Sequence, residues 1–345
     1  MNLHGIVTVL VTPFDANGAI DQTSLRNEVD FAIQGGAAAI CCPAFGSEYY
    51  KLSDPERYHV SKVVVDQTAG RVPVVVGTGL ALGQGMAAGW PALAALAGAV
   101  LIQIGTNLTN DYYDFRKGAD TQERVGPTRV TQSGLIAPGT VLAAGAACFT
   151  LAVVVGIFLV LRGGWPFVAI GLASVLAGWA YTGGPYPLGY HGLGDLFVLV
   201  FFGLVAVPGT FYAQALRLVP AVWPAAVAVG ATGTMILVVN NLRDAETDAR
   251  AGKHTLVVRF GRGFGRAEYV TLLVVALAMP VLMVALGWAR SPVLVALAAA
   301  PLAWPPLSRV LGSTGAALNP ALGTTARFQA AYGLLLALGA WVGGA

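Results

Sequence analysis

The chain has 345 residues, of which 56% are hydrophobic and only 11% are charged, and its mean hydropathy is +0.69. This composition excludes an ordinary soluble globular protein and is typical of an integral membrane protein. The net charge of +3 is too small to indicate a nucleic-acid partner, and the three cysteines lack the spacing of a metal site or a disulfide framework.

The first 71 residues form a charged head with a net charge of −3, whereas the remainder carries +6. Apolar runs at 6–11 and 38–42 predict buried strands, and amphipathic patterns at 22–34 and 54–68 predict helices. A valine-rich run at 72–76 predicts a third strand, which gives a βαβαβ pattern. Such a small parallel unit exposes sheet edges, so we do not expect it to be a stable domain alone.

From residue 72 onward the chain consists of repeated apolar stretches of about 20 residues, the length that crosses a bilayer core. Eight of them are long enough for a full span: 90–112, 137–161, 165–182, 194–215, 219–242, 266–287, 291–311 and 327–344. The run at 72–88 is shorter, and it also predicts a truncated first helix. The predicted fold class is therefore an all-α integral membrane bundle of about eight full transmembrane helices plus a truncated first one, with a small N-terminal βαβα fragment.

Two acidic stretches emerge from the ends of apolar runs: NLTNDYYDFRKGAD at 107–120 and NNLRDAETDARAGK at 240–253. Helical spacing places an asparagine and two aspartates of each stretch on one face. These residues are Asn107, Asp111 and Asp114 in the first motif, and Asn240, Asp244 and Asp248 in the second.

Carboxylates at membrane depth are costly unless a cation neutralises them. Mg²⁺ prefers oxygen ligands and commonly joins one or two carboxylates to substrate phosphates. We therefore predict a Mg²⁺ site for a diphosphate, with the metal held by Asp111, Asp114, Asp244 and Asp248. Bound metal would stabilise a departing pyrophosphate, so that an allylic C–O bond can ionise. The alternative is that these charges only decorate a solvated loop.

Other polar residues beside the motifs are candidates for substrate binding. The amides that would orient carboxylates or metal-bound water are Asn107, Asn110, Asn240 and Asn241. The basic residues that would face the leaving group are Lys117, Arg129, Arg243, Lys253 and Arg259. Asp195 opens the 194–215 segment, where we interpret it as a charge partner of a helix N-terminus rather than as a catalytic group.

Basic residues divide unequally between the two sides of the predicted bundle. The loops at 113–136, 183–193, 243–266 and 312–326, with their flanks, hold twelve Lys or Arg, whereas the opposite side holds only Arg162, Arg217 and Arg290. The positive-inside rule then places both acidic motifs on the cytoplasmic side of a multi-pass protein of the cell membrane.

Four strings give residues 72–345 a resemblance to the UbiA superfamily of membrane aromatic prenyltransferases. They are QIGTNLTNDYYDFRKGAD at 103–120, RVGPTRVTQSG at 124–134, YTGGPYPLGYHGLGD at 181–195 and NNLRDAETDARAGKHTLVVRFG at 240–261. Within the superfamily, the strings are most similar to the branch that prenylates 1,4-dihydroxy-2-naphthoate in menaquinone synthesis.

The resemblance implies about nine helices around a central cavity, with Mg²⁺ and a polyprenyl diphosphate at its cytoplasmic mouth. It implies transfer of the polyprenyl chain to the aromatic acceptor with loss of the ring carboxylate, giving demethylmenaquinone. Arg129 and Lys253 would then contact the diphosphate. Tyr181, Tyr186 and Tyr190 would be walls near the cation or the acceptor, or alternatively aromatic residues of the membrane interface.

The head resembles the dihydrodipicolinate synthase/N-acetylneuraminate lyase family of TIM barrels. The strings are GIVTVLVTPFDANGAID at 5–21, GGAAAICCPAFGSEYYKLS at 35–53 and GRVPVVVGTG at 70–79. The turn at 44–48 of this chain reads AFGSE, where the family has a GTTGE-like sequence. The later strands, which carry the catalytic lysine and tyrosine of the family, are missing from this chain. A third of a barrel cannot close, so we expect residues 1–71 to be an incomplete barrel fragment without lyase activity.

The string VPVVVGTG at 72–79 fits both families, which suggests a fusion by recombination, by construction or by sequence-assembly error. Four alternatives to the naphthoate prenyltransferase therefore stand: an inactive chimeric product, a UbiA-type enzyme with a different aromatic acceptor, a lyase and a transporter. The missing barrel argues against the lyase. The basic cluster beside the carboxylates argues for phosphate rather than for an ion path.

Overall fold

The computed structural model describes residues 7–9, 21, 24–25, 39–41, 72–119 and 129–344. The chain divides into two units, Met1–Ala69 and Gly70–Ala345.

The first unit contains a parallel pair of short strands, β1 (Val7–Val9) and β2 (Ala39–Cys41). Both lie within runs that predict strands, and a parallel pair requires a crossover connection. Ser24 and Leu25 within that connection are helical, and the Ser24 amide and hydroxyl both donate to the Asp21 carboxylate. The predicted helix at 54–68 lies outside the described residues, and the barrel fragment remains a prediction.

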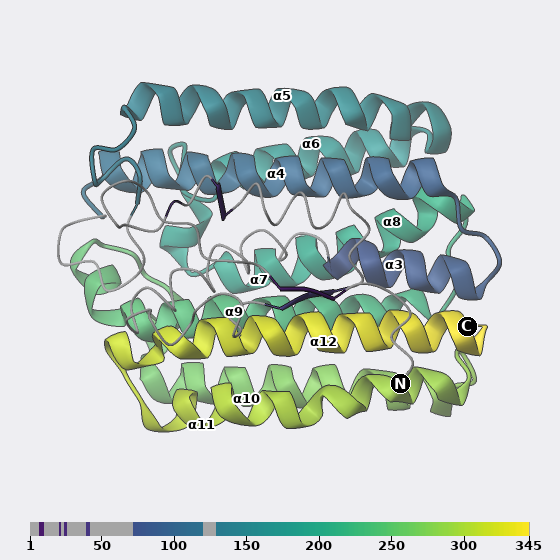
Figure 1. The fold of residues 1–345 in the computed structure, drawn as a ribbon. Helices are drawn as coiled ribbons and strands as arrows, with labels where there is room; N and C mark the ends of the chain where they lie inside the picture. Colours follow the sequence, from purple (N-terminus) through teal and green to yellow (C-terminus); the bar gives the residue numbers. More distant parts are fainter. Residues whose placement is uncertain are drawn as a thin grey trace. The chain divides into compact units, whose positions relative to one another are not determined.

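The second unit is helical throughout its described elements, and most of its helices run side by side (Figure 1). In chain order they are α3 (Val72–Gly83), α4 (Gly89–Arg116), α5 (Pro138–Gly163), α6 (Trp165–Ala180), the short 3-10 helix η3 (Leu188–His191), α7 (Gly194–Val198), the π-helix η4 (Leu199–Val205), α8 (Ala206–Ala215), α9 (Val222–Arg250), α10 (Leu256–Ala285), the 3-10 helix η5 (Ser291–Ala303), α11 (Trp304–Gly312), the short η6 (Gly315–Leu318) and α12 (Asn319–Gly343).

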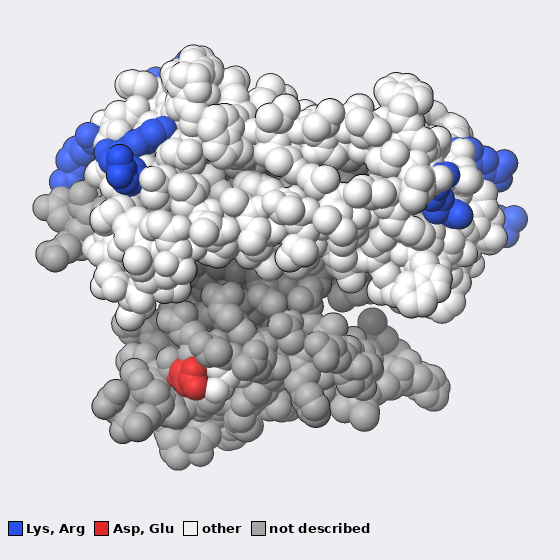
Figure 2. Space-filling view, turned by 90° about the horizontal axis from the view of Figure 1, so that it is seen from above, with Lys and Arg blue, Asp and Glu red and all other residues white. Residues whose placement is uncertain are grey.

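Six of these helical segments are long and apolar enough to cross a membrane. They are α4, α5, the continuous α7–η4–α8 segment, α9, α10 and the continuous η5–α11 segment. The apolar helix α6 has only 16 residues, and α12 is not among the six, so the count of eight full spans remains a prediction. On the face seen in Figure 2, Lys and Arg gather at the two ends of the described helices, and the surface between them is free of charged side chains. This is the surface that a bilayer belt requires.

The valine-rich run at 72–76 is helical, so the predicted third strand is wrong and the predicted short first helix is correct. Val76 and Leu80 of α3 are fully buried in the main apolar core. A Cβ on Gly79 would lie 2.6 Å from the Ala337 Cα, so α3 and α12 touch backbone to backbone. By pattern alone, such an apolar run fits a buried strand or a buried helix equally well.

Helix α9 is the most deeply buried of the six spans, and many of its buried residues are Gly, Ala or Thr. A Cβ on Gly203 of η4 would lie 2.5 Å from the Ala226 carbonyl oxygen and 2.8 Å from the Gly230 Cα. Glycines at this crossing therefore let two backbones meet, as is common between membrane helices.

Both acidic motifs lie on helices that continue past their apolar parts. Helix α4 ends at Arg116 and α9 ends at Arg250. The sequence predicts a loop over 243–266, but within it only 251–255 is non-helical, and α10 contains a break at Gly261 with φ of 85°. The second motif is therefore held by a helix rather than by a loop.

Candidate functional site

The first motif occupies the last turns of α4. Asp111 and Asp114 are 5% and 3% exposed, whereas Asn107 is exposed. The spacing correctly places the two aspartates on one buried face. A carboxylate so deeply buried needs hydrogen-bond donors or a cation.

Asp111 receives its donors from the segment that follows residues 120–128. The Val130 amide donates to Asp111 Oδ2 and the Thr131 amide donates to Oδ1, both at 3.2 Å. Arg129 directly precedes these amides, so the same turn holds Arg129 beside the motif. Asp111 therefore anchors this segment to α4, a role that spacing in the sequence does not reveal.

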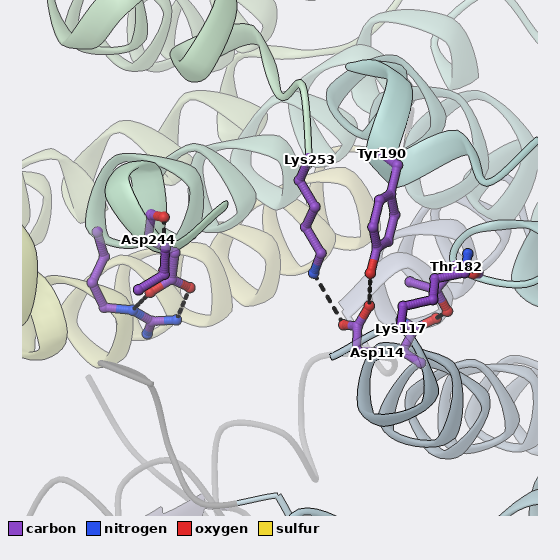
Figure 3. Close-up of polar contacts among 9 residues, drawn as sticks. Asp114, Lys117, Thr182, Tyr190, Asp244 and Lys253 are labelled. Carbon is purple, nitrogen blue, oxygen red and sulfur yellow. Dashed lines mark hydrogen bonds and ion pairs between the residues drawn. The ribbon is translucent and has the colours of Figure 1, made fainter. Parts of the chain in front are cut away.

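Asp114 joins three parts of the chain, as Figure 3 shows. The Tyr190 hydroxyl in η3 donates to Asp114 Oδ1 at 2.9 Å. Lys253, in the turn after α9, places its Nζ 3.1 Å from Asp114 Oδ2. The last residue of the second acidic stretch thus contacts the first motif directly. Burial and the Asp114 carboxylate raise the pKa of Tyr190 well above its usual value, so the phenol keeps its proton and donates.

Lys117 approaches the same tyrosine from the end of α4. Its Nζ lies 4.6 Å from the centre of the Tyr190 ring and donates to the Thr182 carbonyl oxygen at 2.6 Å. Thr182 in turn donates its hydroxyl to Asn110 Oδ1 at 2.7 Å. Burial lowers the pKa of the Lys117 ammonium; Asp114 opposes this shift, and Lys253 adds to it. Sequence reasoning missed Thr182, because its partners are distant along the chain.

The aspartate of the second motif has its own basic partner. Arg243 binds the Asp244 carboxylate in two places, from Nε at 2.7 Å and from Nη2 at 2.5 Å. Arg243 Nη1 also donates to Asn319 Oδ1 at 3.4 Å. Asp248, one turn further along α9, is partly buried. Asp244 with Arg243 forms one group, and Asp114 with Tyr190 and Lys253 forms a second, which we call the Asp114 cluster. In Figure 3, Asp244 and the Asp114 cluster lie apart.

Asn241 turns away from these groups and meets Asp195, which is 4% exposed. The Asn241 Nδ2 donates to both oxygens of Asp195, at 3.3 and 3.4 Å. Asp195 lies in the first turn of α7, as predicted, but it also fixes an asparagine of the second motif. Asn240 is half-buried. The sequence signal that could have drawn attention to Asp195 was a single carboxylate at the start of an apolar span.

The three tyrosines proposed as cavity walls have different surroundings. Tyr190 lies in the Asp114 cluster, and Tyr181 lies in the electrostatic field of Asp195, Asp114 and Asp248. Tyr186 is 57% exposed and stacks on the His191 ring at 3.6 Å between centroids. Only Tyr186 has the exposure of an aromatic residue at an interface.

Within the described ranges, no three His, Cys, Asp or Glu side chains come close enough together to form a metal site by themselves. Asp111, Asp114 and Asp244 each accept hydrogen bonds from amides or basic groups instead. Positive and negative groups are thus interleaved at one end of α4 and α9.

Comparison with known proteins identifies the helical unit. The UbiA prenyltransferase family model matches residues 72–322. The 1,4-dihydroxy-2-naphthoate octaprenyltransferase of Mycobacterium tuberculosis is 47% identical over 232 residues, which cover 67% of this chain and 78% of that protein. The corresponding enzyme of Mycobacterium leprae is 41% identical, over 77% of this chain and 89% of that protein.

Solved structures share the fold at low sequence identity. A UbiA homologue from Aeropyrum pernix has a TM-score of 0.62 at 15% identity, over 80% of this chain and 97% of the homologue. One from Archaeoglobus fulgidus, bound to DMAPP and Mg²⁺, has a TM-score of 0.52 at 17% identity, over 79% and 97%.

The beginning of the chain matches a second family. The dihydrodipicolinate synthetase family model covers residues 2–102, so the two family matches overlap over 72–102. The 4-hydroxy-tetrahydrodipicolinate synthase of Trichlorobacter lovleyi is 45% identical over 75 residues, which cover 22% of this chain and only 26% of that enzyme. By its helical unit, which makes up most of its length, the chain belongs to the UbiA prenyltransferase family.

Proposed function

We propose that this protein transfers a polyprenyl group from a polyprenyl diphosphate to 1,4-dihydroxy-2-naphthoate, with loss of the ring carboxylate, to give demethylmenaquinone in its reduced form. The C–O bond to the diphosphate breaks, a C–C bond to the ring forms, and pyrophosphate and CO₂ leave. Support for the acceptor comes from the naphthoate octaprenyltransferases that align over most of their length.

The contact between Lys253 and Asp114, at 3.1 Å, carries this proposal. This contact joins Lys253, at the end of the second acidic stretch, to the buried Asp114 of the first. Two acidic motifs and their basic neighbours therefore meet at one end of the bundle, where a diphosphate needs both cations and metal ligands.

The donor chemistry of the site fits Mg²⁺. The ion usually keeps several waters and takes one or two protein carboxylates together with substrate phosphates. Among the described residues, the motifs each offer a few oxygens without forming a cluster of three metal-ligating side chains, and this suits an ion shared with water and phosphate better than an all-protein cage. We assign Asp111, Asp114, Asp244 and Asp248 as the residues that would hold it, and the bound metal would stabilise negative charge on the leaving group.

The remaining site residues bind and orient the diphosphate. Lys117 and Lys253 lie beside Asp114 and present ammonium groups to phosphate oxygens, and Arg129 is held next to Asp111. The apolar helices keep water from the allylic cation until the acceptor ring captures it. We place the site at the cytoplasmic surface of a multi-pass cell-membrane protein, on the basis of the loop charges.

The test is a prenylation assay on the full chain in detergent, with Mg²⁺, a polyprenyl diphosphate and 1,4-dihydroxy-2-naphthoate. We expect the prenylated product by mass spectrometry, and its loss on adding a chelator. Asp114→Asn and Asp244→Asn should each lower the rate by about 100-fold or more, because the metal supplies several kcal/mol of transition-state stabilisation. Glu246→Gln, at an exposed carboxylate of the same motif, is the control and should retain the rate. Full Mg²⁺-dependent turnover by Asp244→Asn would refute the metal assignment.

The alternatives are separated by the same assay. Faster product formation with 4-hydroxybenzoate would show that this compound, and not the naphthoate, is the acceptor. A purified, folded chain without turnover on either acceptor would be an inactive fusion product. For residues 1–71 we propose no lyase activity, since the matched segment corresponds to about a quarter of the related synthase.

A further inference from the structure

Tyr190 makes more contacts to charged groups than a cavity wall needs. It is 9% exposed, its hydroxyl donates to Asp114 at 2.9 Å, and two ammonium groups lie against its ring. Lys117 Nζ is 4.6 Å and Lys253 Nζ is 5.0 Å from the ring centre. Tyr190 thus donates its hydroxyl to one carboxylate and has two ammonium groups against its aromatic ring.

Two cations and a carboxylate contact this side chain. Lys117 and Lys253 lie against the ring and Asp114 accepts from its hydroxyl, while the Asp248 carboxylate also acts on the same tyrosine. Like charges held together repel, and an aromatic face offsets part of that cost because its negative quadrupole attracts ammonium groups within about 6 Å. The ring therefore holds two ammonium groups close together, where a diphosphate can accept from both.

The Tyr190 hydroxyl acts on Asp114 rather than on the two lysines. Asp114 uses its two oxygens differently: Oδ1 accepts from Tyr190 and Oδ2 accepts from Lys253. The Tyr190 hydroxyl therefore fixes Oδ1 independently of the Lys253 contact at Oδ2. A partner of this kind behind a carboxylate sets the orientation in which it meets a metal.

We infer that Tyr190 is the positioning residue of this site, and that its two parts act on two different ligands. The hydroxyl orients Asp114 for the divalent cation, and the ring holds Lys117 and Lys253 for the diphosphate. This inference rests on the proposed function, and it distinguishes Tyr190 from Tyr181 and Tyr186.

The two roles are separable with two substitutions. Tyr190→Phe removes the hydroxyl and keeps the ring, so Mg²⁺ should bind about tenfold more weakly or worse, while pyrophosphate affinity at saturating Mg²⁺ stays at the wild-type value. Tyr190→Leu removes both parts, so pyrophosphate affinity should also fall, by about tenfold for two lost cation–π contacts. Tyr186→Phe and Tyr186→Leu are matched controls, because this exposed tyrosine of the same segment contacts His191 instead.

The measurements are calorimetric titrations of the full chain in detergent, first with Mg²⁺ alone and then with inorganic pyrophosphate at saturating Mg²⁺. A loss of Mg²⁺ affinity in Tyr190→Phe with normal pyrophosphate affinity supports the inference. Equal losses of both affinities in Tyr190→Phe, or no loss, would overturn it. That variant alone decides the point if Tyr190→Leu does not fold. If the wild-type chain binds no pyrophosphate with Mg²⁺, the proposed function itself fails, which is a different outcome.

Discussion

The carboxylates at the ends of α4 and α9 receive hydrogen bonds or ion pairs from the chain itself. Asp111 accepts from two backbone amides, Asp114 from Lys253 and Tyr190, and Asp244 from Arg243. Such pairing offsets the large cost of burying charge. Binding of Mg²⁺ to Asp114 would therefore have to displace Lys253, and the freed ammonium would be available to a phosphate.

Replacing Lys253 tests this exchange. Lys253→Gln leaves the buried Asp114 without its cation, so we expect a loss of about 3 kcal/mol in the free energy of unfolding without ligand. Mg²⁺ should then raise the melting temperature of the variant more than that of the wild type, because the metal no longer competes with the ammonium. The measurement is thermal unfolding in detergent with and without MgCl₂, and Lys253→Arg is the control. Equal effects of Mg²⁺ on all three proteins would contradict the exchange.

At the level of residues, the sequence predicted what local spacing determines. The buried face shared by Asp111 and Asp114 follows from helical periodicity. The pairing of Asn241 with Asp195, 46 positions apart, does not, because it depends on how α7 packs on α9. For the same reason the sequence could not separate Tyr190 from Tyr186.

At the level of elements, α3 shows where local pattern fails. Its valines suit a strand or a helix, and the choice depends on distant partners in α8 and α12. Gln214 of α8 donates to the Thr78 hydroxyl at 3.2 Å, and Gly79 meets the backbone of Ala337. Six of the eight apolar spans were predictable, because length and hydropathy suffice for them.

Gly79→Ala tests the packing of α3. The added methyl group would meet the backbone of α12, which cannot move cheaply, so we expect a loss of about 1–3 kcal/mol in stability. Gly98→Ala on α4 is the matched control, because no described atom lies within 4 Å of its added Cβ. The comparison needs only melting temperatures in the same detergent. Equal melting temperatures for the two variants would mean that α3 does not pack closely against α12.

For the whole molecule, the distribution of Lys and Arg predicts the orientation in the membrane. Single cysteines placed at exposed Glu246 and exposed Ser291 should lie on opposite sides, since α10 and its flanks separate them. After removal of Cys41, Cys42 and Cys148, we expect an impermeant maleimide to label Ser291→Cys in intact cells. Glu246→Cys should be labelled only after lysis. The reverse pattern would invert the topology and place the site outside the cytoplasm.

The division of the chain at residues 69 and 70 lies close to the start of the UbiA match at residue 72, whereas the dihydrodipicolinate synthetase match continues to residue 102. Sequence strings predicted both families, because each string is long and specific. Their shared run at 72–79 could be read either way, and the structure places it in the helical unit.

The self-contained pairing of the carboxylates bears on how the protein is made. The helices pack against one another before any cofactor has been acquired, and a buried aspartate without donors would resist that step. Lys253, Arg243 and the amides of Val130 and Thr131 supply each motif with donors from the same polypeptide. Biogenesis of the bundle would then be independent of cellular magnesium, and the metal would be needed only when a substrate arrives.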